Sequence, residues 1–394
     1  MSRRFSNAAA ALAVVVFLSS PGRSEEAAAI IERIEGAQTP SREGLDPFTL
    51  AEVMEKYGVP GVSVAVIHDF ELHWAKGYGI ADVETRKAVD TETLFQAASI
   101  SKPVAAMAAL RAVELDAFTL DTDINKIAKR WQLPSDGFTT ARPVTPRALL
   151  SHTSGLGDGF GFPGYHPDDP RPTTVQILDG GPPSNVGSVR MEREPLTGFK
   201  YSGGGVTLMQ LALTDAMGKP FPVLLQELVL GPIGMTESAY EQPLSPSRDS
   251  NAARAHDRSG QARDAKWHVY PELQAAGLWT TPVDLAKFAI EVQLSLQGES
   301  NRVLSRATVL EMVTPVGVGD FGVGFSVSKQ GEGWYFGHGG SNWGFRCSLL
   351  AHKVKGYGVV IMTNADNGSI VARELGDRVA RAYGWDLLDK PIPR

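Results

Sequence analysis

The sequence contains a single cysteine, Cys347, so no disulfide can form within the chain. Cys347 lies in the apolar stretch WGFRCSLLA, and no catalytic pattern of histidine or asparagine accompanies it. This context favours a buried structural thiol over a nucleophilic one. The fold must therefore be held together by packing, and a hydrophobic content of 43% is sufficient for a sizeable core.

Clustered positive charge is also missing. Lysine and arginine number 38 against 44 acidic residues, which gives a formal net charge of −6, and no basic run occurs after residue 30. Because nucleic acids bind to clustered basic surfaces, we expect no nucleic-acid partner.

Motifs for metals and nucleotides are absent or misplaced. The eight histidines include no H-x-x-x-H pair, which argues against a zinc site. Two G-x-G-x-x-G matches, at 159–164 and 317–322, neither follow a strand nor open a helix, so they predict no dinucleotide site. The G-x-S-x-G elbow of α/β-hydrolases does not occur. We expect no metal or organic cofactor.

The first 24 residues have the pattern of a secretory signal peptide. Arg3 and Arg4 precede an apolar run over 8–18, which is too short to span a bilayer, and Gly22 and Ser24 have the spacing of a cleavage site. An uncleaved N-terminal anchor is the alternative. The pattern predicts a periplasmic or secreted protein with no stable membrane span after signal cleavage.

The periodicity of apolar residues changes along the chain. Alternation over 60–80 predicts two strands, and four short strands follow between 321 and 364. Helices are predicted between these regions and at the end, over 99–115, 121–131, 145–151, 204–218, 220–231, 282–297 and 369–384. The Gly- and Pro-rich segment 155–187 is typical of a long loop that lines a site.

This order predicts an α/β fold of the α+β type. An antiparallel sheet is built from N- and C-terminal segments, flanked by helices, and a mostly α-helical region is inserted between them. We assign residues 45–98 and 267–386 to the sheet region and residues 99–266 to the helical region, together forming one unit.

One short stretch, QAASISKPVAAM (residues 96–107), carries the strongest chemical signal. Ser99 and Lys102 are three residues apart at the start of a predicted helix, so their side chains share one face. A serine hydroxyl is a poor nucleophile unless a base removes its proton, and a desolvated lysine can be that base. The first free N–H groups of the helix would face a developing oxyanion. The alternative is structural: Ser99 as a helix N-cap and Lys102 as a solvated charge.

Two further motifs support the chemical interpretation. Tyr201-Ser202-Gly203 comes directly before a predicted helix, where a tyrosine hydroxyl could project into a cleft. His338-Gly339-Gly340-Ser341 lies on a predicted strand, where glycines allow close approach of a substrate to the backbone.

The three motifs in this order resemble those of the serine β-lactamases and penicillin-binding-protein-like hydrolases, of the class C β-lactamase and family VIII carboxylesterase type. The resemblance covers roughly 45–385 and includes LLSHTSGL, LGPIGMTES, AAGLWTTPVDLAKF and FGHGGSNWGF. It implies that Ser99 is acylated, Lys102 accepts its proton and Tyr201 relays a proton. It also implies a substrate-binding strand at His338, Gly339 and Gly340, and an oxyanion hole formed by the backbone N–H groups of Ser99 and Ser341.

The sequence departs from the family pattern at two positions. The family motif Y-x-N is here Tyr201-Ser202-Gly203, and the lysine of K-T-G is replaced by His338. A lysine attracts the carboxylate of a β-lactam, whereas a histidine is mostly neutral at pH 7. We therefore expect a carboxylesterase that acts on small, short-chain esters. His338 as a hydrogen-bonded structural residue is the alternative at that position.

Other functions stay open. A D-amino-acid peptidase, a transpeptidase-like enzyme or a weak β-lactamase would act on cell-wall-like amides, and a non-catalytic envelope protein would only bind a ligand. The aromatic residues Phe160, Phe162, Tyr165, Trp279, Trp343 and Phe345 lie in or beside the motif segments. They could form an apolar acyl pocket, although at least half are expected to pack in the core.

Overall fold

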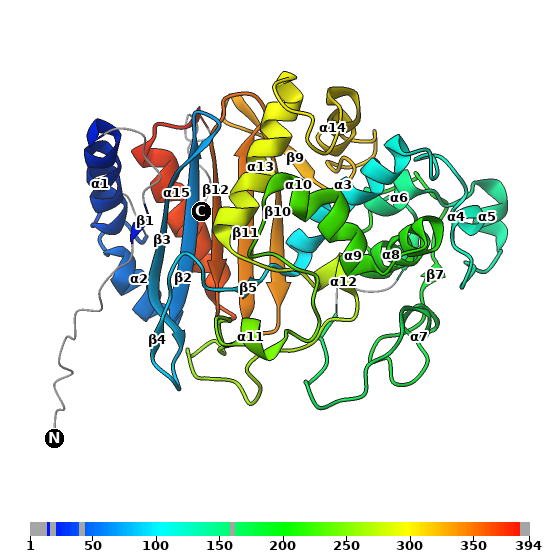
Figure 1. The fold of residues 1–394 in the computed structure, drawn as a ribbon, viewed down its shortest axis with the longest axis horizontal. Helices are drawn as coiled ribbons and strands as arrows, with labels where there is room; N and C mark the ends of the chain where they lie inside the picture. Colours follow the sequence, from blue (N-terminus) through cyan, green and yellow to red (C-terminus); the bar gives the residue numbers. More distant parts are fainter. Residues whose placement is uncertain (1–13, 16–20, 39–43, 158–161, 387–394) are drawn as a thin grey trace.

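An antiparallel sheet forms the centre of the computed structural model, which describes residues 14–15, 21–38, 44–157 and 162–386 (Figure 1). Its strands come from the two ends of the chain, and all of its pairings are antiparallel. In spatial order they are β1 (Val14–Val15), β3 (Glu71–Asp82), β2 (Gly61–His68), β12 (Gly358–Thr363), β11 (Phe345–His352), β10 (Gly333–Asn342) and β9 (Ser326–Gln330), with β4 (Lys87–Ala88) on β3.

Helices cover both faces of the sheet (Figure 1). Alternate residues of a strand point to opposite faces, so Val64 and Val66 of β2 pack towards α1 (Pro21–Glu35), α2 (Leu50–Lys56) and α15 (Gly368–Ala382). Ala65 and Ile67 pack in the other direction, in the cluster that contains α13 (Pro282–Gln297). The alternating valines of β2 thus pack in one core, and the residues between them pack in the other.

The remaining helices lie between the two groups of strands along the chain. They are α3 (Ser101–Glu114), α4 (Ile124–Ile127), α5 (Gly137–Ala141), α6 (Pro146–Leu150), α7 (Thr174–Asp179), α8 (Gly203–Met217), α9 (Phe221–Leu225) with the π-helical turn η2 (Gln226–Leu230), α10 (Gly231–Ile233), α11 (Pro246–Asp249) and α12 (Leu273–Ala276); α14 (Arg306–Met312) follows α13. Two small strand pairs, β5 (Phe95–Gln96) with β8 (Trp279–Thr280) and β6 (Leu156–Gly157) with β7 (Arg190–Met191), complete the fold.

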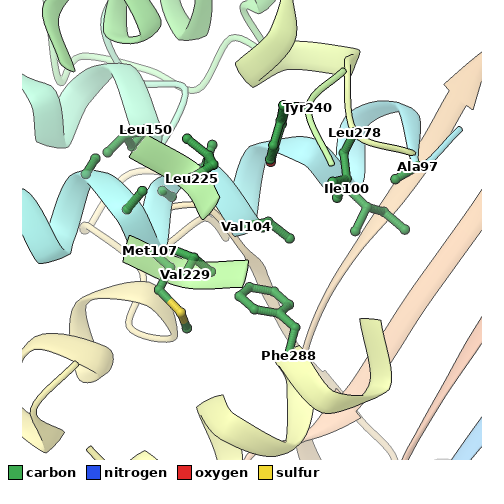
Figure 2. Packing of buried hydrophobic residues seen from close by; sticks show 14 of the residues in the cluster. Ala97, Ile100, Val104, Met107, Leu150, Leu225, Val229, Tyr240, Leu278 and Phe288 are labelled. Atoms are coloured by element: carbon green, nitrogen blue, oxygen red, sulfur yellow. The ribbon is translucent and has the colours of Figure 1, made fainter. Parts of the chain in front are cut away.

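Helix α3 is buried along most of its length. Eleven of its fourteen residues are buried, many of them alanine, so neighbouring elements approach it closely from several sides. Figure 2 shows Val104 and Met107 of α3 with Val229 of η2 and Phe288 of α13. Because one hydrophobic cluster runs from the inserted helices to the sheet, the first turn of α3 is held rigidly.

The predicted fold class is confirmed: the structure combines an antiparallel sheet, built from N- and C-terminal segments, with flanking helices. The segment 155–187 is less irregular than expected, because it contains α7 and one short strand. The strand predicted at 321–327 starts only at Ser326, since the chain bends just before it at Gly324, which has a φ of +106°.

Most of the predicted signal peptide (1–24) lies outside the described residues, and it stays a prediction. Of that segment, Val14–Val15 form β1 and the helix α1 begins at Pro21. Within the described part of the chain, no helix has both the length and the apolar character that crossing a bilayer requires.

Candidate active site

Ser99 lies in a tight turn between the short strand β5 and helix α3. The 3₁₀ turn η1 (Ala98–Ile100) follows β5 directly and leads into α3. Ala98 has a φ of +50°, in the left-handed region that residues with a Cβ rarely adopt. This strained backbone places Ser99 before the helix, and Ser99 caps neither element, because the N-cap positions are Ala97 and Ile100. The N-cap alternative for Ser99 is therefore wrong.

Lys102 occupies the first turn of α3 and is 4% exposed. Its Nζ donates to Ser99 Oγ at 3.0 Å and to the carbonyl oxygen of Ala275 in α12 at 2.7 Å. A buried amine held against a serine hydroxyl by a second, fixed bond has the geometry that a serine nucleophile and its base require. Lys102 is not the solvated charge of the alternative interpretation.

Tyr201 lies just before α8 and faces the lysine. Lys102 Nζ lies 5.0 Å from the centre of the Tyr201 ring. On another side, the ring of His152 stacks on Tyr201 with 4.1 Å between the ring centres. The Ser202 backbone N–H donates to His152 Nδ1 at 3.1 Å. His152 thus fixes both the ring of Tyr201 and the backbone that follows it.

His152 was not singled out from the sequence, although it lies in the quoted stretch LLSHTSGL. It is 1% exposed and has a φ of +58°. Burial, together with the positive charge of Lys102, holds the pKa of His152 well below its usual value. The ring therefore stays neutral, which leaves Nδ1 free to accept the Ser202 N–H.

Strand β10 brings the third motif against the nucleophile. A Cβ at Gly340 would come closer than 3.0 Å to the carbonyl oxygen of Ala97, so only glycine allows this approach to η1. His338 is 8% exposed, and its Nδ1 lies 2.6 Å from the Gly339 carbonyl oxygen. Burial and the positive charge of Lys102 lower the pKa of His338 to about 4. The histidine is therefore neutral near pH 7.

These residues share one cleft with a volume of about 920 Å³, within the range of small-molecule sites. Seven of the nine predicted site residues line it: Ser99, Lys102, Tyr201, His338, Gly339, Gly340 and Ser341. Ser202 and Gly203 do not. Ser202 is fully buried and accepts the Gly205 N–H as the N-cap of α8. It positions Tyr201 and has no access to a substrate.

Of the six aromatic residues in or beside the motif segments, some line the cleft and others pack in the core, as expected. Phe162 and Trp343 line the cleft, whereas Tyr165, Trp279 and Phe345 are buried in the core. Phe160 lies outside the described residues.

Cys347 is 6% exposed and its Sγ donates to the Gln96 carbonyl oxygen, while burial raises the pKa of its thiol well above the usual value. This agrees with a structural thiol.

Among the residues that the structure describes, no group of three or more His, Cys, Asp or Glu side chains has the arrangement of a metal site. The chemistry available in the cleft is that of Ser99, Lys102 and Tyr201, with the backbone N–H groups around them.

In this β-lactamase-like fold, the serine is hydrogen-bonded to a buried lysine, and the lysine faces a tyrosine. This arrangement defines a serine hydrolase of the β-lactamase and penicillin-binding-protein class. The family model described as Beta-lactamase matches residues 49–383. The chain belongs to this family.

Known proteins similar to the chain have different activities. It is 26% identical over 255 residues to unguisins hydrolase ungD of Aspergillus violaceofuscus, which covers 60% of this chain and 42% of that protein. It is 27% identical over 195 residues to esterase EstB of Burkholderia gladioli, with 47% and 48% covered. The chain thus spans less than half the length of these two relatives. The structure of D-amino acid amidase from Ochrobactrum anthropi SV3 superimposes with a TM-score of 0.69 at 23% identity, over 91% of this chain and 98% of that one.

Proposed function

We propose that this serine hydrolase is a carboxylesterase for small, short-chain esters and that it reacts through an acyl-enzyme on Ser99. Ser99 Oγ attacks the ester carbonyl carbon while Lys102 takes its proton, and the backbone N–H groups of Ser99 and Ser341 hold the oxyanion. Tyr201 passes a proton to the departing alkoxide. Water then attacks the acyl carbon, and the carboxylic acid leaves as Ser99 regains its proton.

The observation that carries this proposal is the state of His338. A lysine at this position would present a fixed cation to the carboxylate of a β-lactam or a D-alanyl terminus. The buried imidazole of His338, with a pKa of about 4, presents none at neutral pH. The cleft wall next to Ser99 and Tyr201 is therefore suited to an uncharged acyl ester.

A second observation concerns the missing asparagine. A Cβ at Gly203 would lie 2.8 Å from Cε2 of Phe162, so an asparagine at this position would require the ring to shift. The Phe162 ring, which lines the cleft, occupies the space where an amide contact would otherwise form. Glycine at position 203 thus removes the hydrogen-bonding group of the family's asparagine and leaves the apolar ring of Phe162 in its place. This favours an ester with an apolar acyl chain.

The test compares kcat/KM for p-nitrophenyl butyrate and a chromogenic cephalosporin, using wild type and Ser99→Ala. We expect fast butyrate cleavage, little cephalosporin turnover, and a loss of several orders of magnitude in Ser99→Ala. A preference for the cephalosporin would instead identify a β-lactamase or peptidase. Absence of any turnover, with no reaction of Ser99 with a serine-directed phosphonate, would favour a binding protein.

A further inference from the structure

One residue of the cleft, Asn342, has a buried polar side chain that none of the proposed steps uses. It is the last residue of strand β10 and directly follows Ser341. It lines the cleft, yet it is only 4% exposed. Burying an amide costs free energy unless the amide is hydrogen-bonded, so the partners of Asn342 show what its side chain contributes.

The side chain of Asn342 lies on the face of β10 that approaches the nucleophile turn. Alternate residues of a strand share a face, so Asn342 lies on the same side as Gly340. On this side, the missing Cβ of Gly340 lets the strand come close to the Ala97 carbonyl oxygen. Gly340 thus permits the approach of β10 to η1, and Asn342 lies where a side chain can hold it.

Asn342 donates two buried hydrogen bonds from its side-chain nitrogen. Its Nδ2 donates to Gln96 Oε1 of β5 at 2.8 Å and to the Ala276 carbonyl oxygen of α12 at 3.1 Å. Gln96 in turn donates from Nε2 to the carbonyl oxygen of His268 at 2.7 Å. One side-chain amide therefore links β10, β5 and α12, which are far apart in the sequence.

Backbone carbonyls determine the orientation of both amides, because a carbonyl oxygen can only accept. The His268 carbonyl requires the NH₂ group of Gln96, so Gln96 presents its oxygen to Asn342. The Ala276 carbonyl requires the NH₂ group of Asn342. Position 342 therefore needs two donors on one atom. Asparagine provides them, whereas an ionised aspartate of the same shape can only accept.

The bond to α12 lies next to the anchor of the catalytic lysine. The Ala276 carbonyl accepts from Asn342, and the preceding carbonyl, that of Ala275, accepts from Lys102 Nζ at 2.7 Å. Helix α12 has only four residues, so few hydrogen bonds of its own hold it in place. A displacement of the Ala276 carbonyl would therefore also move the group that holds Lys102 against the nucleophile.

The other two ends of the link lie next to the nucleophile and the oxyanion site. Gln96 precedes Ser99 by three residues, at the entry to the turn η1. Asn342 itself directly follows Ser341, whose backbone N–H is part of the proposed oxyanion hole. Each segment that Asn342 joins thus carries one group of the proposed reaction.

We propose that Asn342 is a positioning residue, whose two N–H groups hold the nucleophile turn, the anchor of Lys102 and the oxyanion strand in one arrangement. This inference rests on the proposed function, because it takes Ser99 as the nucleophile. Asn342 acts through these three segments and not on the substrate. Loss of its bonds should therefore slow the reaction of Ser99 without weakening the binding of the ester.

The experiment measures kcat and KM for p-nitrophenyl butyrate in Asn342→Leu and Asn342→Asp. Leucine has a similar size and removes both bonds, and aspartate keeps the shape but turns acceptors towards two acceptors. We expect kcat to fall about 100-fold, because a misplacement of about 1 Å has this effect, with KM within threefold of wild type. Labelling of Ser99 by a fluorophosphonate should slow by a similar factor. Gln96→Met breaks the link from its other end and should lower kcat at least 10-fold.

A matched control separates positioning from general destabilisation. Asn364 is also fully buried, and its Nδ2 likewise donates to two backbone carbonyls, those of Ile80 at 3.1 Å and Ala81 at 3.0 Å. It does not line the cleft. Asn364→Leu should lower the midpoint of urea unfolding, as Asn342→Leu does, but should keep kcat within threefold of wild type.

A kcat within threefold of wild type in a folded Asn342 variant would overturn the inference. An equal loss of kcat in Asn364→Leu would do the same, because the loss would then follow from lower stability. If neither Asn342 variant folds, Gln96→Met is judged by the same criterion. If wild type cleaves no ester but Ser99 still reacts with the fluorophosphonate, the esterase proposal fails, and the labelling rates of the variants test the inference alone. A wild-type Ser99 that does not react at all would refute both.

Discussion

Adding one methyl group at Gly340 should separate strand β10 from the nucleophile turn. In Gly340→Ala the new Cβ would lie inside 3.0 Å of the Ala97 carbonyl oxygen and 3.2 Å from the Ala98 Cβ. An ordinary van der Waals contact of a Cβ atom begins at 3.4 Å. The nearest atom, the Ala97 oxygen, belongs to the backbone and cannot rotate away as a side chain can. The strand and η1 must therefore move apart by roughly 0.5–1 Å.

This displacement acts on the geometry between Ser341 and Ser99. A misplacement of about 1 Å in an active site can reduce the rate about 100-fold, so we expect kcat/KM for p-nitrophenyl butyrate to fall 10- to 100-fold. In free energy of activation this is about 1.4–2.7 kcal/mol. Overpacking also lowers the free energy of unfolding by about 1–3 kcal/mol, without preventing folding.

Steady-state kinetics and urea unfolding of the same preparations measure both effects. Gly376→Ala in α15 is the control, because its Cβ would meet only Ile361 Cδ1 at 3.8 Å. It should retain wild-type activity and unfold no earlier than wild type. A kcat/KM of Gly340→Ala within threefold of wild type would refute this reasoning, because it would show that the oxyanion site does not depend on the close approach of β10 to η1.

Two other predictions concern buried groups behind the cleft. His152→Phe keeps a ring against Tyr201 but removes Nδ1, which accepts the buried Ser202 N–H. We expect the free energy of unfolding in urea to fall by about 1–3 kcal/mol and kcat to fall as well. An unchanged stability would contradict the role of Nδ1. Glu272 is fully buried, and burial raises its pKa from 4.5 to about 8. The folded state then binds more protons between these pH values, so the free energy of unfolding should fall as pH rises, by up to about 1.4 kcal/mol per pH unit. Glu272→Gln should remove this slope in urea titrations from pH 5 to 8, and an identical slope in wild type and variant would show that Glu272 is ionised when folded.

The sequence predicted the parts of the site whose signals are local. Ser99 and Lys102 are one helical turn apart, and the alternating valines of β2 and the apolar runs of β10 to β12 mark the sheet. Each of these patterns is determined within a few residues, so it can be interpreted without knowledge of the tertiary contacts.

The parts that were missed depend on contacts between distant segments. Lys102 is anchored by the Ala275 carbonyl, and Tyr201 is supported by His152. A backbone carbonyl has no sequence signature, and nothing in the sequence indicates that His152 adopts a positive φ. Likewise, the loop that carries Phe162 next to Gly203 follows no periodicity, so the reason for the missing asparagine emerges only in three dimensions.

The central claim is that Ser99 is the nucleophile and that the neighbouring lysine activates it. The most direct measurement is intact-protein mass spectrometry with peptide mapping after exposure to a fluorophosphonate, for wild type, Ser99→Ala and Lys102→Met. We predict one adduct, located on Ser99, in wild type, none in Ser99→Ala, and much slower labelling in Lys102→Met. An adduct on another serine, or undiminished labelling in Lys102→Met, would contradict the account.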